Sequence, residues 1–169
     1  MNAVHWVRFA WELEKFTTVP PSLPPSYAIR RAIAEERATV TAVALSTFTL
    51  NSDWNPSFKE VRPLIEKAIH DVFHEKNDPF CLIVTHGSRI IGASGLSAEN
   101  EAPNHLLTGP CLSLEYQNRG LASALLAHSL LALKEAGVTT ARGVTKQGSC
   151  AAQFIYSKFG SISLAEGKK

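Results

Sequence analysis

The stretch LSLEYQNRGLASALL, Leu112 to Leu126, passes from a short apolar segment through a polar turn into an alanine- and leucine-rich run. Leucines recur in this run at helical spacing, which predicts a helix that begins after Gly120. The first turn of a helix carries unpaired N–H groups and the positive end of the dipole, so it can bind phosphate. Gly120 and Ala122 leave that turn uncovered. Taken alone, the stretch predicts an ordinary polar helix start over a leucine core more strongly than a phosphate site.

Two common nucleotide motifs are missing from the sequence. It contains neither G-x-x-x-x-G-K-[ST] nor G-x-G-x-x-G, which excludes a P-loop and a Rossmann dinucleotide site. A diphosphate would therefore be bound by the backbone amides of this turn, and Arg119 would add a positive charge. The candidate residues are Gln117, Asn118, Arg119, Gly120, Leu121 and Ala122.

Length and composition indicate one globular domain, residues 1–169, with a real core. The formal net charge of +2 is too small to indicate the basic surface that a nucleic-acid-binding protein usually carries, which argues against a nucleic-acid partner. Cys81, Cys111 and Cys150 lie far apart without C-x-x-C spacing, so we predict neither a disulfide framework nor a metal site. Charged residues interrupt the N-terminal apolar stretch and no run is long enough to span a bilayer. We therefore expect a cytoplasmic protein without a membrane partner.

The N-terminal segment, residues 5–16, alternates apolar and polar side chains, which predicts a half-buried strand. Residues 17–26 hold four of the nine prolines and predict a stiff, extended connector. A short strand begins at Tyr27 and leads into a helix over 33–48. The apolar residues expected to share one face of that helix are Ile33, Val40, Val43, Ala44 and Phe48.

A second helix is predicted to start at a capping box formed by Ser57 and Glu60 and to run to about His74, with Pro63 kinking it or delaying its start. Two strands over 79–85 and 90–97 predict a hairpin, and a third strand over 105–114 is interrupted by Gly109 and Pro110. The later elements are a helix over 120–136 capped by Gly137, a strand over 138–145, a short helix over 149–159 and a brief C-terminal strand. The order predicts an α/β fold with a mixed, mostly antiparallel central sheet and flanking helices.

Two motifs together resemble those of the GNAT acetyltransferase superfamily. The pattern [RQ]-x-x-G-x-[GA] is matched by Gln117, Gly120 and Ala122 after a strand and before a long helix. A second motif on the short downstream helix is matched at Ala152, Tyr156, Lys158 and Gly160, with Ser149 where an asparagine is usual. The combination is more specific than either part, and the resemblance covers residues 27–160.

The resemblance implies a GNAT-like acyltransferase fold with acetyl-CoA as co-substrate. The turn amides would bind its pyrophosphate, and the backbone of Leu112 and Leu114 would bind the pantetheine arm. Ser149 and Lys158 belong to the implied cofactor site. The implied activity is transfer of an acetyl group to a primary amine of a small molecule or peptide, by direct attack on the thioester. The alternative is a non-catalytic acyl-CoA-binding module of the same fold.

The C-terminus departs from the family pattern. Ser161 replaces the usual aromatic residue, and only eight residues follow it, too few for two closing strands. We hypothesise that residues 5–16 fill the position of the family's last strand, in the same chain or in a partner. The alternative is an edge or dimerisation strand elsewhere, and the resemblance leaves a homodimer open.

For catalysis the resemblance implies that Tyr156 donates a proton to the coenzyme sulfur. Ordinary pKa values near ~10 and ~8.5 make that transfer uphill by roughly 2 kcal/mol, so it requires a lowered tyrosine pKa or a sulfur that is still partly bonded. The alternative is that the ring packs against Phe154 and Phe159.

The general base is not identified by the motifs. His105 is our candidate because an unperturbed imidazole has a pKa of about 6.5. Glu99, Glu101 and Asp53 are weaker alternatives, each also explained as a solvated loop residue. The resemblance implies that the loop between the two helices, which holds Asp53, helps to shape the acceptor pocket. Trp54, beside Asp53, would form part of an acceptor wall or simply pack.

Overall fold

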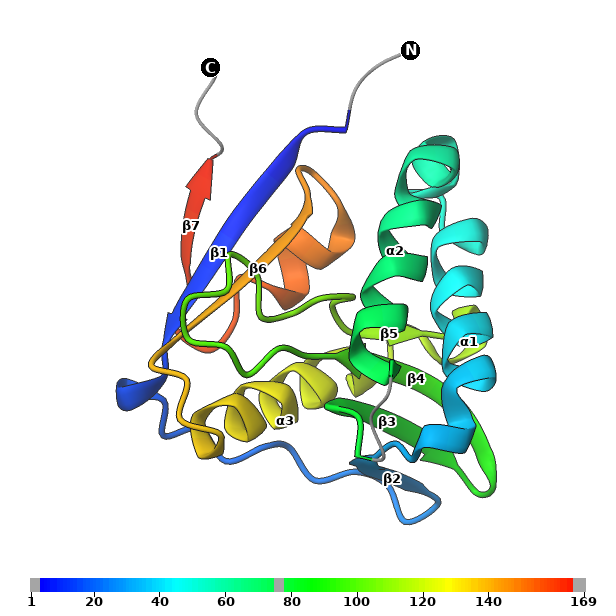
Figure 1. Ribbon diagram of the computed structural model, residues 1–169, viewed down its shortest axis with the longest axis horizontal. Coiled ribbons are helices and arrows are strands. Elements are labelled where there is room, and N and C mark those ends of the chain that lie inside the picture. Colours follow the sequence, from blue (N-terminus) through cyan, green and yellow to red (C-terminus); the bar gives the residue numbers. More distant parts are fainter. Residues whose placement is uncertain (1–3, 75–77, 166–169) are drawn as a thin grey trace.

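The computed structural model describes residues 4–74 and 78–165 (Figure 1). One antiparallel sheet has the order β2-β3-β4-β5, formed by Tyr27–Arg31, Cys81–His86, Arg89–Gly95 and Cys111–Leu112. A second has the order β6-β1-β7, formed by Thr140–Lys146, Trp6–Glu12 and Ile162–Ala165. The expected α/β fold with mainly antiparallel strands and flanking helices is confirmed. The strands form two sheets, however, where one was expected.

Helices cover both faces of the four-stranded sheet (Figure 1). Successive residues of a strand point to opposite faces. Ile83 packs in a cluster with side chains of α1, Arg37–Leu50, and α2, Phe58–Phe73, whereas its neighbour Val84 packs with α3, Leu121–Glu135. The sheet is thus the middle of three layers. No helix within the described ranges is long and apolar enough to cross a bilayer.

The N-terminal strand lies in the middle of the second sheet (Figure 1). β1 pairs antiparallel with β6 from Trp6↔Lys146 to Glu12↔Thr140, and with β7 from Val7↔Ala165 to Ala10↔Ile162. Phe9 and Trp11 are buried, as the alternation predicted. The segment therefore forms a strand within the same chain and at the centre of its sheet, not at an edge. That it fills the position of the family's last strand stays a prediction. The proline-rich connector then leads from β1 to β2.

The two sheets meet at one end and part at the other. The amides of His105 and Leu106 both donate to the Arg142 carbonyl, at 2.7 and 3.1 Å. Leu106 packs so closely on Gly143 that a Cβ there would lie 2.8 Å from a Leu106 methyl carbon. Gly109, at φ 67°, then turns the chain, as its predicted interruption of the strand implied. β5 beyond it has only two residues, and it pairs with β4.

Two local expectations fail. Ile33 is 53% exposed and precedes a 3-10 turn, so it is not on the buried face of α1. Ser57 makes no capping hydrogen bond, because it belongs to the 3-10 turn Asn55–Ser57 and lacks the extended backbone of a cap. Pro63 lies inside α2 and does not delay its start, so of the two expected effects a kink stays a prediction. The predicted short helix near the C-terminus is a π-helix, Ala151–Ile155.

The N-terminal strand is predicted to contribute substantially to stability through Trp11, which is 1% exposed and whose indole N–H donates to the Lys158 carbonyl at 2.9 Å. Trp11→Phe leaves that carbonyl without its partner and should lower the free energy of unfolding by about 1–3 kcal/mol. Chemical denaturation measures the change. The exposed neighbour substitution Glu14→Gln should alter it by less than about 0.5 kcal/mol. Equal effects of the two substitutions would show that β1 does not anchor the sheet.

Candidate active site

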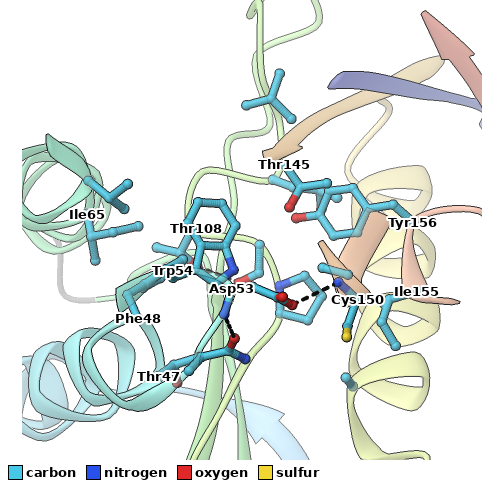
Figure 2. Close-up of a pocket in the computed structure, with 18 of the residues that line it drawn as sticks. Thr47, Phe48, Asp53, Trp54, Ile65, Thr108, Thr145, Cys150, Ile155 and Tyr156 are labelled. Carbon is cyan, nitrogen blue, oxygen red and sulfur yellow. Dashed lines mark hydrogen bonds between the residues drawn. The ribbon is translucent and has the colours of Figure 1, made fainter. Parts of the chain in front are cut away.

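A pocket of about 610 Å³ lies where the two sheets part. Leu112 of β5 lines one side, and Val144 and Thr145 of β6 line the other. Side chains of α1, α2 and the π-helix complete the wall, and Figure 2 shows Thr47, Phe48 and Ile65 across the cavity from Tyr156 and Ile155. The pocket therefore gathers residues from nearly the whole length of the chain.

Leu112 presents its backbone to the pocket side. The Ser113 amide donates to the Ile91 carbonyl of β4 at 2.8 Å, and neighbouring residues of a strand direct their backbone polar groups to opposite edges. The N–H and C=O of Leu112 consequently face away from β4. Its carbonyl accepts hydrogen bonds from Thr47 Oγ1 at 2.9 Å and Gln117 Nε2 at 3.2 Å. These two bonds fix the orientation of the Leu112 peptide.

The polar turn before α3 contains two residues with left-handed backbone. Asn118 and Gly120 have φ values of 64° and 79°, and Gly120 stands at the N-cap of α3. Three of the six predicted turn residues, Gln117, Asn118 and Ala122, line the pocket. Arg119 is exposed and its guanidinium lies over the Tyr116 ring, 5.7 Å from the centroid. The turn thus borders the pocket directly.

Leucines 114 and 121, also predicted to bind the cofactor, lie outside the pocket lining. Leu114 is 51% exposed in a 3-10 turn, Leu114–Tyr116. Leu121 is 2% exposed and packs with Leu125 in the core beneath the sheet. Any contribution of Leu121 to a ligand is accordingly limited to its backbone amide.

Lys158 of the second motif contacts the first turn of α3. Its Nζ donates to Ser123 Oγ at 2.8 Å, which places a positive charge beside the first turn of the helix. Ser149 is 2% exposed and its hydroxyl oxygen accepts from the Ala152 amide at 3.2 Å. The Ser149 hydroxyl is therefore bonded to the first turn of the π-helix, and Ser149 does not line the pocket.

Tyr156 lines the pocket and is 3% exposed. Its ring packs edge-on against Phe9 and Trp11, with centroids 5.6 and 5.9 Å apart. Its hydroxyl lies against Gly109, where a Cβ would come within 2.2 Å of the oxygen, so only glycine fits there. Burial raises the pKa of the Tyr156 phenol. The ring is thus held by the N-terminal strand and not by Phe154, which is 61% exposed.

His105 is not placed to act as a base. Its imidazole is fully buried; Nδ1 accepts from the Arg142 amide at 3.0 Å, and Nε2 donates to the Glu99 carbonyl at 2.8 Å. Both ring nitrogens are thereby engaged, Nδ1 by β6 of the second sheet and Nε2 by the loop that carries His105, and the residue does not line the pocket. Burial lowers the pKa of His105, which keeps it neutral.

Of the weaker candidates, Asp53 and Trp54 line the pocket, whereas Glu99 and Glu101 are exposed and lie outside its lining. The sequence reasoning also missed lining residues that come from separate elements, namely Thr47, Thr108, Thr145 and Cys150. Cys150 lies inside the second motif and was the one member that position in the sequence could have suggested. The others become neighbours only through the fold.

A family model described as the acetyltransferase (GNAT) family matches residues 46–160, well over half of the chain. The match contains the polar turn, the start of α3 and Tyr156. No curated protein matches the sequence.

Several solved structures share the fold. A GCN5-related N-acetyltransferase from Sphaerobacter thermophilus matches 97% of this chain and 50% of its own, at a TM-score of 0.63 and 14% identity. A Drosophila protein matches 97% and 50%, at 0.62 and 15%. A GNAT-family acetyltransferase from Colwellia psychrerythraea matches 95% and 53%, at 0.60 and 15%. The chain spans about half the length of these structures, and identities this low establish the fold alone.

The buried, neutral state of His105 predicts a loss of stability in acid. Its folded pKa lies below the unfolded value of about 6.5, so its contribution is complete above that pH and is lost as the pH falls toward the folded pKa. Burial lowers the pKa of His128 as well, in the same direction. The free energy of unfolding should therefore decrease from pH 7.5 to 5.5.

Denaturation curves across this range for His105→Gln should show a shallower pH dependence than the wild type. The variant should also lose about 1–3 kcal/mol at pH 7.5, because the bond between the two sheets is broken. A His128→Gln control should retain the part of the slope that belongs to His105. An unchanged slope in His105→Gln would contradict this role.

Proposed function

The chain belongs to the acetyltransferase (GNAT) family, and from this we propose that it transfers an acetyl group from acetyl-CoA to a primary amine of a small molecule or peptide. The amine nitrogen attacks the thioester carbonyl carbon directly, a C–N bond forms and the C–S bond breaks. One observation carries the proposal: the polar turn of the first motif and Tyr156 of the second line the same pocket.

The residues around the start of α3 are suited to a pyrophosphate. Gly120 adopts a left-handed backbone that leaves the amides of the first turn uncovered, with no neighbouring atom within 4 Å of a Cβ placed there. The positive end of the helix dipole and the charges of Arg119 and Lys158 would stabilise the bound anion. The donor set therefore fits the implied co-substrate.

The Leu112 peptide is suited to orient the thioester. Its N–H faces the pocket side of β5, and a rigid backbone donor aimed at a carbonyl oxygen stabilises the negative charge that develops on it. The hydrogen bonds from Thr47 and Gln117 to the Leu112 carbonyl hold this donor in place, so that it need not reorganise during the reaction.

Tyr156 is suited to protonate the leaving sulfur, although its pKa is raised and not lowered. Burial raises the phenol pKa, so the site does not supply the lowered pKa that was one condition for this role. The proton stays on Tyr156 at neutral pH. It is transferred to the sulfur as the C–S bond breaks and negative charge develops on that atom. His105, with both nitrogens engaged, has no part in this scheme.

Tyr156→Phe should lower kcat by a factor of about 10² to 10⁴, because the general acid is removed while the ring packing is kept. The Kd for acetyl-CoA should change less than about twofold. Thiol release over an amine panel measures the first quantity, and calorimetry measures the second. Tyr27→Phe, the same change on β2 outside the pocket lining, is the control. Acetyl-CoA binding without turnover of any amine in the wild type would indicate a non-catalytic binding module.

Gly120→Ala should raise the Kd for acetyl-CoA about tenfold or more, because an alanine at φ 79° is strained by roughly 1–2 kcal/mol and the turn must shift. Gly137→Ala provides a matched control, since Gly137 has φ 93°, equally open surroundings, and a position at the far end of α3. Both variants should lose similar stability, but only the first should bind acetyl-CoA more weakly. Equal Kd values would place the pyrophosphate elsewhere.

A further inference from the structure

The pocket has an apolar wall. It is formed by side chains of β1, α1, α2 and the loop between the two helices, namely Trp6, Phe48, Trp54, Val61, Leu64 and Ile65. The Trp54 ring centroid lies 4.9 Å from that of Phe48 and 5.9 Å from that of Trp6. Figure 2 shows Phe48, Trp54 and Ile65 gathered on this side. We call this surface the aromatic wall.

Leu64 is the member of the aromatic wall that lies most open. It is 52% exposed, in contrast to Val61 and Ile65 of the same helix, which are 2% and 6% exposed. An apolar ligand that covers Leu64 would remove further apolar surface from water, which is favourable in proportion to the area covered. The wall therefore favours an apolar group in the part of the pocket that it borders.

Asp53 is the single acidic side chain among the described residues that line the pocket. Its position is fixed at three atoms: its N–H donates to Asn51 Oδ1 at 2.8 Å, its carbonyl accepts from Lys146 Nζ, and its Oδ2 accepts from the Cys150 amide at 2.9 Å. Figure 2 shows the carboxylate directed across the pocket toward Cys150. The carboxylate raises the pKa of the adjacent Cys150 thiol, so its negative charge acts within the pocket.

We propose that the acceptor is a small primary amine attached to an aromatic or branched aliphatic group. The apolar group lies on the aromatic wall, and the attacking nitrogen donates a hydrogen bond to the Asp53 carboxylate. This inference rests on the proposed function and adds the chemical class of the acceptor to it. An acceptor with its own carboxylate near the nitrogen is disfavoured, because that group would face Asp53.

The position of Asp53 also suits the charge that the reaction creates. A neutral amine becomes positively charged at nitrogen as its bond to the acetyl carbon forms. The Asp53 carboxylate stabilises this charge and takes the released proton, while Tyr156 gives its proton to the departing sulfur. One C–N bond forms, one C–S bond breaks, and one proton is gained and one lost by the protein, which solvent restores. A carboxylate that accepts a proton only during bond formation need not deprotonate the free ammonium ion.

The acceptor class is tested with 2-phenylethylamine, 3-methylbutylamine and ethanolamine, three primary amines that differ in the apolar character of their substituent. kcat/KM for the first two should exceed that for ethanolamine by about 10- to 100-fold. Leu64→Ser, a change at an exposed position, should reduce this preference severalfold. Equal kcat/KM for ethanolamine and 2-phenylethylamine would overturn the inference while leaving the proposed acetyl transfer intact.

The role of Asp53 is tested with Asp53→Asn, which keeps the shape and an oxygen for the Cys150 amide but removes the charge. kcat/KM for 2-phenylethylamine should fall at least tenfold, with the Kd for acetyl-CoA unchanged within about twofold. Asp71→Asn, the same change on an exposed face of α2, is the control. Unchanged kcat/KM in Asp53→Asn would overturn this role.

Cys150 supplies a readout that does not depend on turnover. It is exposed and lines the pocket, whereas Cys81 and Cys111 are buried and burial raises the pKa of each to about 12. In the presence of CoA, 2-phenylethylamine should slow the alkylation of Cys150 by iodoacetamide, and ethanolamine should not. Protection without turnover would overturn the proposed function, while still showing that the pocket binds amines of this apolar class. Alkylation at the same rate with either amine would overturn the acceptor class.

Discussion

The pocket depends on the way in which two sheets are joined at one end and separated at the other. His105 and Leu106 are bonded to Arg142 at the joined end, and Leu106 fills the space that Gly143 leaves. Beyond this seam, Gly109 turns the chain away and leaves room for the Tyr156 hydroxyl. If the two sheets paired along their whole length, the Leu112 N–H would donate a hydrogen bond to the neighbouring strand. Because they part, it faces a cavity.

The N-terminal strand supports the site from the opposite end of the chain. β1 lies between β6 and β7, and its buried face carries Phe9 and Trp11 onto the Tyr156 ring. The Trp11 indole also donates to the Lys158 carbonyl, two residues after Tyr156. The short segment that carries the second motif includes a π-helix of five residues, Ala151–Ile155. Its position is set by a strand that is more than a hundred residues away in sequence.

The candidates for proton transfer are separated by their surroundings rather than by their residue type. The ordinary pKa of histidine suits proton removal near neutral pH. Both ring nitrogens of His105, however, are hydrogen-bonded to backbone groups, and the residue is buried where the two sheets are joined. Asp53 comes from the loop between α1 and α2, and the fold brings its carboxylate within 2.9 Å of the Cys150 amide nitrogen in the pocket lining. A side chain's chemistry is useful only where its atoms remain accessible to a ligand.

Local patterns in the sequence determined most strands and helices, the polar turn before α3 and the two motifs that identify the family. Each of these depends on residues close together in the chain, such as alternation in residues 5–16 or the left-handed Gly120. Tertiary structure alone decided that the sheet divides, that Ile33 stays exposed, that His105 is structural and that the Asp53 carboxylate meets the Cys150 amide. The physical reason is that burial and hydrogen bonding at these positions are set by partners from distant segments, whose approach no local pattern encodes.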